Sequence, residues 1–315
     1  MSAERFTVAV VGAGSVGATM AYAMLVRGSA RRVVLHDINK AKVRAEVLDL
    51  GHGAMFVPQA EIDGSDDVEV CRGADVVVVT AGAKQKPGQS RMELAGTTVD
   101  LMKTILPSVQ AVAPDAVYVM VTNPVDVVTY ASLKITDLPP DRIFGSGTVL
   151  DSSRLRWLVS AACDVAVGNV HAYMAGEHGD TEVPIWSSAA IGNVPLLDWE
   201  AQTGRLGPGR RDAIAEQVVN AAYEVISGKG ATNYAVGLAG ARIVESIRGD
   251  ENRILPVSTL LQDWHGITDV CMSVPTIVNA HGAGQRLLIP VDAIELARLK
   301  ESAEAIRGQA RRLGF

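Results

Sequence analysis

The sequence predicts an α/β protein, with a doubly wound parallel sheet in its first half and a second α+β domain after it. In the first half, short β-branched runs alternate with segments of helical composition. A glycine-rich turn follows the first of these runs. The 315 residues suffice for two domains, and we expect the first to span residues 1–146 and the second 147–315.

Composition narrows the class of ligand. The formal net charge is −6 and no Lys/Arg tract is present, which disfavours nucleic acid and anionic membranes as partners. No apolar run reaches the ~20 residues of a membrane span. Cys71, Cys163 and Cys271 are far apart, as is typical of reduced thiols rather than of a disulfide framework or a zinc site. We expect a cytoplasmic protein with a small-molecule ligand and no bound metal.

The glycine-rich turn has the order of elements that a dinucleotide site requires. An apolar run at 7–11 is followed by Gly12-Ala-Gly14-Ser-Val-Gly17 and then by the helical segment 18–25. Gly12 would form the tight turn, Gly14 would let the backbone approach a pyrophosphate, and Gly17 would let helix and strand pack closely. This arrangement predicts a Rossmann nucleotide-binding domain.

A carboxylate follows the second predicted strand, residues 32–36. Asp37 could hold both ribose hydroxyls of the cofactor and would repel a 2′-phosphate, which favours NAD over NADP. Alternatively, Asp37 caps the helix that begins near Asn39. Lys42, one turn into that helix, either leans toward the adenosine or is solvated.

Further strands are predicted to complete a sheet of six. They are residues 68–70, 74–80, 116–121 and 142–144. Ligands lie at the carboxyl ends of such strands, so the polar loop after 74–80 is predicted to be a substrate lid near residues 83–95. Arg91 in this loop either faces the cleft or is solvated on a helix.

Asn123 follows the strand predicted at 116–121. It precedes Pro124, which holds it extended, so its amide could reach the crevice at the strand ends and meet a carbonyl or hydroxyl. Alternatively, the Asn-Pro pair is simply a turn.

The second half contains a candidate acid/base group. His178 lies in a predicted turn, and an imidazole titrates near neutral pH. Alternatively, it is a structural histidine at a strand end. A helix that opens at residue 149 places Asp151 and Arg154 on one face, because they are three positions apart. These two could also form an ordinary ion pair within the helix.

Together these side chains predict a reaction class. Asp151 would fix the tautomer of His178 and favour its protonated form, so that the other ring nitrogen donates to a carbonyl oxygen. Arg154 would bind a substrate carboxylate, and Arg91 would polarise the carbonyl. With hydride from nicotinamide, this chemistry reduces a 2-oxo acid to a 2-hydroxy acid. A non-catalytic NAD sensor would not need these four side chains.

Over nearly its whole length the sequence resembles the L-lactate and malate dehydrogenase family. The resemblance rests on Gly12-x-Gly14-x-x-Gly17, Asp37, Gln85–Arg91, Thr122–Asp126, Leu150–Arg156, Gly176–Asp180 and Gly228–Tyr234. It implies His178 as proton donor and acceptor, Asp151 as its partner, Arg154 as carboxylate clamp and Arg91 as the lid arginine. It also implies that Asn123 and Thr232 contact the substrate, with Asn123 also beside the nicotinamide. The residues that it implies around the cofactor are Val16, Gly82, Ala83, Ser146 and Val236.

Gln85 is the position that distinguishes substrates within this family. The resemblance implies that malate dehydrogenases carry arginine there, paired with the second carboxylate of oxaloacetate. A neutral amide would leave that carboxylate desolvated and unpaired, so Gln85 favours pyruvate and L-lactate. Malate dehydrogenase activity and branched 2-oxo acids remain alternatives.

Arg156 and His171 match the pair with which bacterial allosteric members of the family bind fructose 1,6-bisphosphate between subunits. A guanidinium and an imidazolium suit a phosphate group. The resemblance therefore implies a homotetramer activated by this bisphosphate. Alternatively, both are ordinary surface or interface residues.

Overall fold

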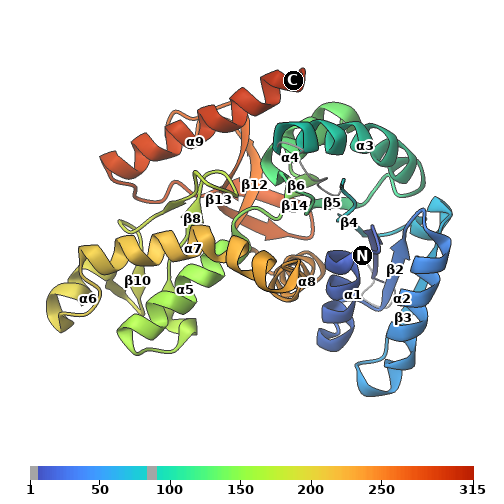
Figure 1. The fold of residues 1–315 in the computed structure, drawn as a ribbon, viewed down its shortest axis with the longest axis horizontal. Coiled ribbons are helices and arrows are strands. Elements are labelled where there is room, and N and C mark those ends of the chain that lie inside the picture. The colour runs from blue at the N-terminus through green and yellow to red at the C-terminus, as the bar shows by residue number, and fades with distance from the viewer. Residues whose placement is uncertain (1–5, 84–90) are drawn as a thin grey trace.

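The computed structural model describes residues 6–83 and 91–315. Its centre is a nine-stranded sheet in the order β14-β13-β12-β6-β5-β4-β1-β2-β3, with helices on both faces (Figure 1). The first half contributes six parallel strands, β1 (Thr7–Val11), β2 (Arg32–His36), β3 (Glu61–Ser65), β4 (Val76–Val79), β5 (Val117–Met120) and β6 (Ile143–Gly145). The predicted doubly wound sheet is confirmed. Its order reverses between β1 and β4, where such sheets bind ligands.

The strand predicted at residues 68–70 is wrong. Val68–Cys71 form a short 3₁₀ helix, η2, and the strand beside β2 is β3. β3 lies at the edge of the sheet and exposes Glu61 and Asp63, so it lacks the apolar run of a buried strand. Val68 and Val70 instead point their partly buried side chains toward the core from η2, which imitates a strand pattern.

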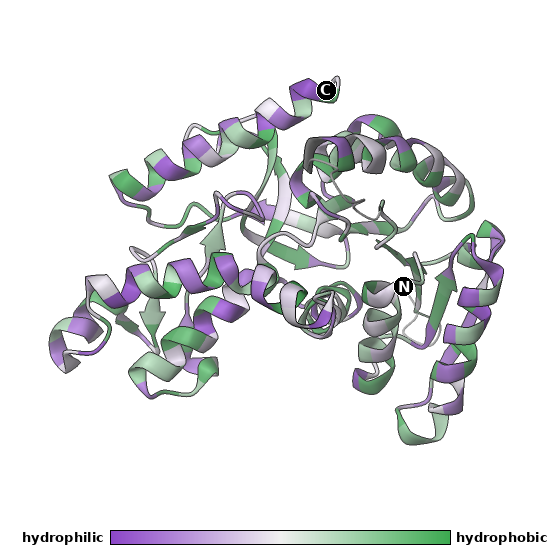
Figure 2. Ribbon diagram, viewed as in Figure 1, coloured by the Kyte–Doolittle hydropathy of each residue, from purple (hydrophilic) through white to green (hydrophobic). Residues whose placement is uncertain are grey.

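Helices cover both faces of the parallel sheet. They are α1 (Ser15–Arg27), α2 (Lys40–His52), α3 (Arg91–Val112) and α4 (Val125–Thr136), with the short η1 (Ala54–Phe56) after α2. The four valines of β4 are fully buried, because α1 packs on one face of the sheet and α3 on the other. In Figure 2 the central strands are hydrophobic and the outer helices alternate in hydropathy.

The second half is α+β, as predicted. Its helices are α5 (Val149–Cys163), α6 (Leu196–Thr203), α7 (Pro208–Lys229), α8 (Tyr234–Arg248), α9 (Ala293–Arg312) and the short η3 (Val167–Asn169). Its strands are β7 (Val170–His171), β8 (Met174–Ala175), β9 (Val183–Pro184), β10 (Ala190–Ile191), β11 (Val194–Pro195), β12 (Arg253–Leu261), β13 (Val270–Asn279) and β14 (Gly282–Arg286). β12 pairs antiparallel with β6 at Ser258 and Gly145, so the second half extends the first sheet.

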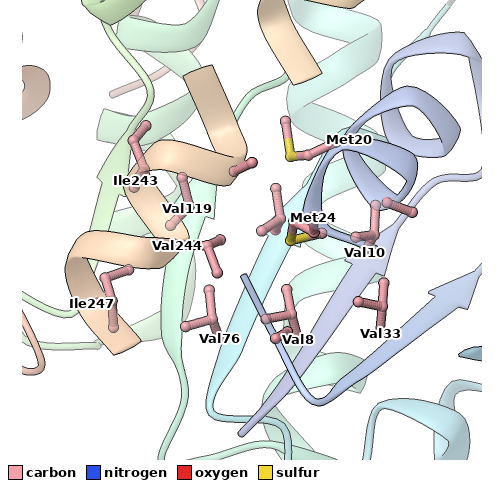
Figure 3. Packing of buried hydrophobic residues seen from close by; sticks show 14 of the residues in the cluster. Val8, Val10, Met20, Met24, Val33, Val76, Val119, Ile243, Val244 and Ile247 are labelled. Carbon is pink, nitrogen blue, oxygen red and sulfur yellow. The ribbon is translucent and has the colours of Figure 1, made fainter. Parts of the chain in front are cut away.

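Helix α8 joins the two halves. Figure 3 shows Ile243 and Val244 of α8 in one cluster with Met20 and Met24 of α1 and with the central strands. The two helices touch closely, because a Cβ added to Gly240 would lie 2.2 Å from Cε of Met20. The first half of the chain is therefore covered partly by the second half.

Glu245 of α8 anchors this contact with charge. Its carboxylate accepts from Arg27 Nε at 2.6 Å, Ser29 Oγ at 2.8 Å and Arg242 Nη1 at 2.7 Å. Burial opposes the ionised form, but these hydrogen bonds lower the pKa of Glu245 from 4.5 to about 2. A lowered pKa stabilises the folded state above pH 4.5, and this contribution disappears as the pH falls through 2.

Glu245→Gln is expected to lower the free energy of unfolding at pH 7 by about 1–2 kcal/mol, because the charged partners are partly screened by solvent. The deficit should shrink as the pH falls below 4.5. Urea denaturation of both proteins between pH 7 and pH 3 measures it. The control Glu69→Gln removes an exposed pair with Arg72 and should cost less than about 0.5 kcal/mol. A deficit independent of pH would contradict the assignment.

The cysteines and the helices can be set beside the predictions of reduced thiols and of no membrane span. Cys71, Cys163 and Cys271 are all buried and free. Within residues 6–83 and 91–315, no helix has both the length and the apolar character needed to cross a bilayer.

Candidate active site

The glycine turn has the geometry that a dinucleotide site needs. Gly12 adopts φ +105°, which favours glycine. A Cβ on Gly17 would lie 1.9 Å from the carbonyl oxygen of Gly12, so only glycine lets α1 start this close to β1. A Cβ on Gly14 would meet nothing within 4 Å, which leaves the backbone there open to a ligand at the N-terminus of α1.

Asp37 ties the end of β2 to the glycine turn. Its Oδ2 accepts from the amide of Ala13 at 2.8 Å and its Oδ1 from the amide of Asn39 at 2.9 Å. The alternative role of Asp37 as cap of α2 is wrong, because Asn39 is the N-cap and accepts from the amide of Lys42. Lys42 itself is half-buried in the first turn of α2. A carboxylate at this strand end suits the ribose of NAD.

The ends of β4 and β5 meet closely. Thr122 Oγ1 donates to the carbonyl of Ala81 at 2.7 Å, and a Cβ on Gly82 would lie 2.5 Å from Cγ2 of Thr122. Gly82 therefore packs against the residue that precedes Asn123, and Asn123 follows β5 and is exposed. These strand ends lie next to the glycine turn in the sheet order.

Most of the predicted lid lies outside the described residues, and so does Gln85. Arg91 is the first residue of α3, but its side chain is likewise not described. The roles of Gln85 and Arg91 therefore stay predictions.

Asp151 holds two of the predicted catalytic side chains. It lies in the first turn of α5 and is 1% exposed. Its Oδ2 lies 2.6 Å from Nδ1 of His178, and its Oδ1 accepts from Nη1 of Arg154 at 2.7 Å. The predicted ion pair of Asp151 and Arg154 within the helix is thus present, and Asp151 also contacts His178. Since Asp151 occupies Nδ1, only Nε2 of His178 remains for a substrate.

The charges of this group favour a protonated imidazole. Burial lowers the affinity of His178 for a proton, but the charge and hydrogen bond of Asp151 outweigh it and raise the pKa of His178 to about 9. Burial works against ionised Asp151 as well, yet His178 and Arg154 bring the pKa of Asp151 below its usual value. At neutral pH the imidazole can therefore act as an acid toward a carbonyl oxygen.

Asp126 was not predicted to have a role, yet it fixes the position of the histidine. It is buried, its Oδ2 accepts from the backbone amide of His178 at 2.7 Å, and its Oδ1 accepts from Oγ of Ser258 at 2.6 Å. On the other side of the turn, the amide of Glu177 donates to Oγ of Ser302 in α9. The turn is therefore held by α4, β12 and α9. The sequence signals this role of Asp126 only by placing an acid among the apolar residues at the start of α4.

A cavity of about 150 Å³ brings together seven of the predicted site residues. The predicted residues on its wall are Val16, Asn123, Ser146, Arg154, His178, Thr232 and Val236. The lining residues that sequence reasoning missed are Met20, Val121, Gly147, Leu150, Ala222, Ile226, Ala239 and Gly240. A mainly apolar wall with a few polar groups is typical of a pocket for a small substrate and its cofactor. For Ala222 and Ile226, the sequence signal was their spacing of four positions, which places both on one face of α7.

Arg156 and His171 do not line this cavity. Nε of Arg156 donates to the carbonyl of Ala172 at 2.9 Å, and the guanidinium lies 5.0 Å from the ring centroid of Tyr173. His171 is exposed in β7, directly before Ala172. The guanidinium is thus held beside the strand that presents His171.

Both halves of the chain match models of known domains. Residues 6–145 match the NAD binding domain of lactate/malate dehydrogenase, and residues 148–311 match the alpha/beta C-terminal domain of the same family. An L-lactate dehydrogenase of Bifidobacterium animalis subsp. lactis is 57% identical over 98% of this chain and 97% of its own. An L-lactate dehydrogenase of a Synechococcus species is 43% identical over 95% of this chain and 96% of its own.

Solved structures agree with these matches. A lactate dehydrogenase from a Medee basin deep-sea metagenome library has a TM-score of 0.96 at 35% identity, and the match covers 99% of this chain and 100% of that one. The minor L-lactate dehydrogenase of Enterococcus mundtii has a TM-score of 0.95 at 35% identity, with 99% of both chains covered. From its two domains in order, its glycine turn and its aspartate–histidine pair, the chain belongs to the lactate/malate dehydrogenase family of NAD-dependent oxidoreductases.

Proposed function

We propose that the protein is an NAD-dependent L-lactate dehydrogenase that interconverts pyruvate and L-lactate. The observation that carries this proposal is the hydrogen bond between Asp151 and His178, because His178 lines a cavity together with Arg154 and Asn123. The names of the most similar relatives support the same activity. Free, buried cysteines are consistent with work in the cytoplasm.

Each side chain has a distinct part in the proposed reaction. His178 gives the proton on Nε2 to the carbonyl oxygen of pyruvate while Asp151 stays ionised and stabilises the imidazolium. Arg154 uses one guanidinium nitrogen for Asp151, so its others can bind the substrate carboxylate. Asn123 and Thr232 position the substrate, and Arg91 would face it from the lid. When bound, NADH supplies the hydride.

The cofactor would extend from this cavity along the strand ends. Gly12, Gly14 and Gly17 would hold its pyrophosphate, and Asp37 its ribose. Val16, Gly82, Ala83, Ser146 and Val236 would line the rest, and Lys42 would approach the adenosine. In the opposite reaction, neutral His178 accepts the hydroxyl proton of L-lactate.

Parallel assays of NADH oxidation test this proposal. With pyruvate and oxaloacetate at equal concentrations, pyruvate should have the larger kcat/KM. A preference for oxaloacetate would mean malate dehydrogenase activity. NADH binding without turnover of either substrate would indicate a non-catalytic NAD sensor. 2-Oxoisocaproate, included as a third substrate, tests the branched 2-oxo acids.

We also propose a homotetramer that fructose 1,6-bisphosphate activates through Arg156 and His171. Arg156 bonds to the residue after the exposed His171, and neither side chain lines the catalytic cavity, which supports a separate effector site. Two large apolar side chains outside that site support subunit contacts, because Met55 is 90% exposed and Phe56 is 83% exposed in the single chain.

Arg156→Ala is expected to abolish activation by fructose 1,6-bisphosphate, since the guanidinium is the stronger of the two phosphate ligands. Titrations of pyruvate with and without the bisphosphate measure the effect as a change in KM. The control Arg72→Ala removes an exposed arginine of the first half and should respond like the parent protein. If the Arg156 variant is still activated, the effector site lies elsewhere.

A further inference from the structure

A second buried carboxyl group lies beside the catalytic pair and has no part in the reaction described above. Glu182 comes four positions after His178, directly before β9, and is 9% exposed. Oxygen or nitrogen atoms of Asp151, His178 and Glu182 all lie within 4.8 Å of one another. In the described part of the chain, Oε2 of Glu182 is buried and has no hydrogen-bond partner.

Glu177, another acid of this segment, is arranged differently. The carboxylate of Glu177 accepts from Oγ1 of Thr181 at 2.6 Å and from Nε2 of Gln309 at 3.0 Å. Glu177 thus has hydrogen bonds that explain its presence, as part of the anchor to α9. Oε2 of Glu182 has no such hydrogen bond to a described residue, so hydrogen bonding does not explain why this carboxyl group is buried here.

The charges of four neighbouring groups act on Glu182. They are Asp151 and Arg154 from α5, Asp126 from α4 and His178 from the turn. Burial, and after it the charge of Asp151, raise the pKa of Glu182 to about 9. The carboxyl therefore keeps its proton at neutral pH, where a second buried negative charge beside Asp151 would be costly.

The titrations of Glu182 and His178 are linked. Loss of the proton from Glu182 adds a negative charge near the imidazole, which raises the affinity of His178 for its own proton. In alkaline solution the first proton lost from this pair can come from Glu182 to solvent, while His178 stays charged. Asp151 and Asp126 act in the same direction on His178 but are already ionised at that pH.

We propose that Glu182 is a positioning residue whose buried carboxyl group, within 4.8 Å of the Asp151–His178 pair, acts through His178 and keeps its imidazole protonated in alkaline solution. This rests on the proposed function, because it takes His178 as the proton donor to pyruvate. Its consequence is a wider pH range of pyruvate reduction. Glu182 makes no contact with pyruvate in this scheme and moves no proton to it.

The pH profile of pyruvate reduction tests the proposal. In Glu182→Gln, kcat at pH 7 should stay within about twofold of the parent, because an amide replaces a carboxyl that is neutral there. The pH above which kcat/KM falls should be lower by about one unit in this variant. Glu182→Asp should restore part of that shift. Glu177→Gln, which removes an acid of the same segment that faces α9, should leave this pH unchanged.

A second readout does not depend on turnover. Diethyl pyrocarbonate reacts with neutral imidazole, so mass spectrometry of the His178 peptide across pH should show modification beginning about one pH unit lower in Glu182→Gln. Coincident profiles for parent and variant would overturn the proposal while leaving the lactate dehydrogenase assignment intact. A large loss of kcat at pH 7 without a change in the pH above which kcat/KM falls would also overturn it. Failure of the parent to reduce pyruvate would overturn the proposed function instead.

Discussion

His178→Asn is expected to slow pyruvate reduction by about 10³-fold, within the range that loss of a general acid costs. An asparagine amide has no proton to give to a carbonyl oxygen near neutral pH. NADH binding should persist, since the glycine turn and Asp37 do not involve the histidine. Single-turnover kinetics with pyruvate would measure the first effect, and quenching of intrinsic fluorescence by NADH the second.

The matched control is His281→Asn, which changes an exposed histidine of a loop between β13 and β14. It should turn over pyruvate at the parent rate. Full activity in the His178 variant would exclude this side chain as the proton donor. Loss of NADH binding together with turnover would show that the substitution had disturbed the fold around Asp151 and Asp126.

Gln85→Arg is expected to change the ratio of kcat/KM for pyruvate to that for oxaloacetate by about 10²–10³-fold in favour of oxaloacetate. The reason is that a buried, unpaired carboxylate costs several kcal/mol and a guanidinium would pair it. Initial rates of NADH oxidation with both substrates over a range of concentrations measure the ratio.

Gln89→Arg adds the same charge four positions further along the predicted lid. It serves as the control for a general attraction of dianions, and its substrate ratio should stay close to that of the parent. Equal shifts in the two variants would mean that the total charge of the predicted lid, and not residue 85, determines the substrate preference. An unchanged ratio in Gln85→Arg would remove the argument for pyruvate that rests on this residue.

The parallel half of the fold was predictable because its strands are buried on both faces. Such strands read as unbroken apolar runs, and β4 consists of four valines. β3 escaped prediction because an edge strand needs no such run, and two valines of η2 imitated one. The short strands β7 to β11 carry no pattern of their own, since two-residue strands depend on their partners.

The same distinction holds for the site. The glycine turn and the Asp151–Arg154 pair are local, so their spacing alone placed them correctly. His178 and Asp151 are 27 positions apart, and their pairing followed from chemistry rather than from periodicity. The support from Asp126 and Ser258, which are 132 positions apart, depends on how β12 meets α4. No short window of sequence contains that information.

The close packing of α8 on α1 limits which relatives could recombine with this enzyme to give a folded hybrid. A Cβ on Gly237 would lie 2.9 Å from the backbone oxygen of Thr19, and Met20 fills the space left by Gly240. A hybrid gene spliced at residue 146 would unite α1 from one parent with α8 from the other. Recombination at this border therefore preserves the contact only when residue 237 stays small against the backbone of Thr19 and residue 240 matches the side chain at position 20, so the two halves are constrained to evolve together.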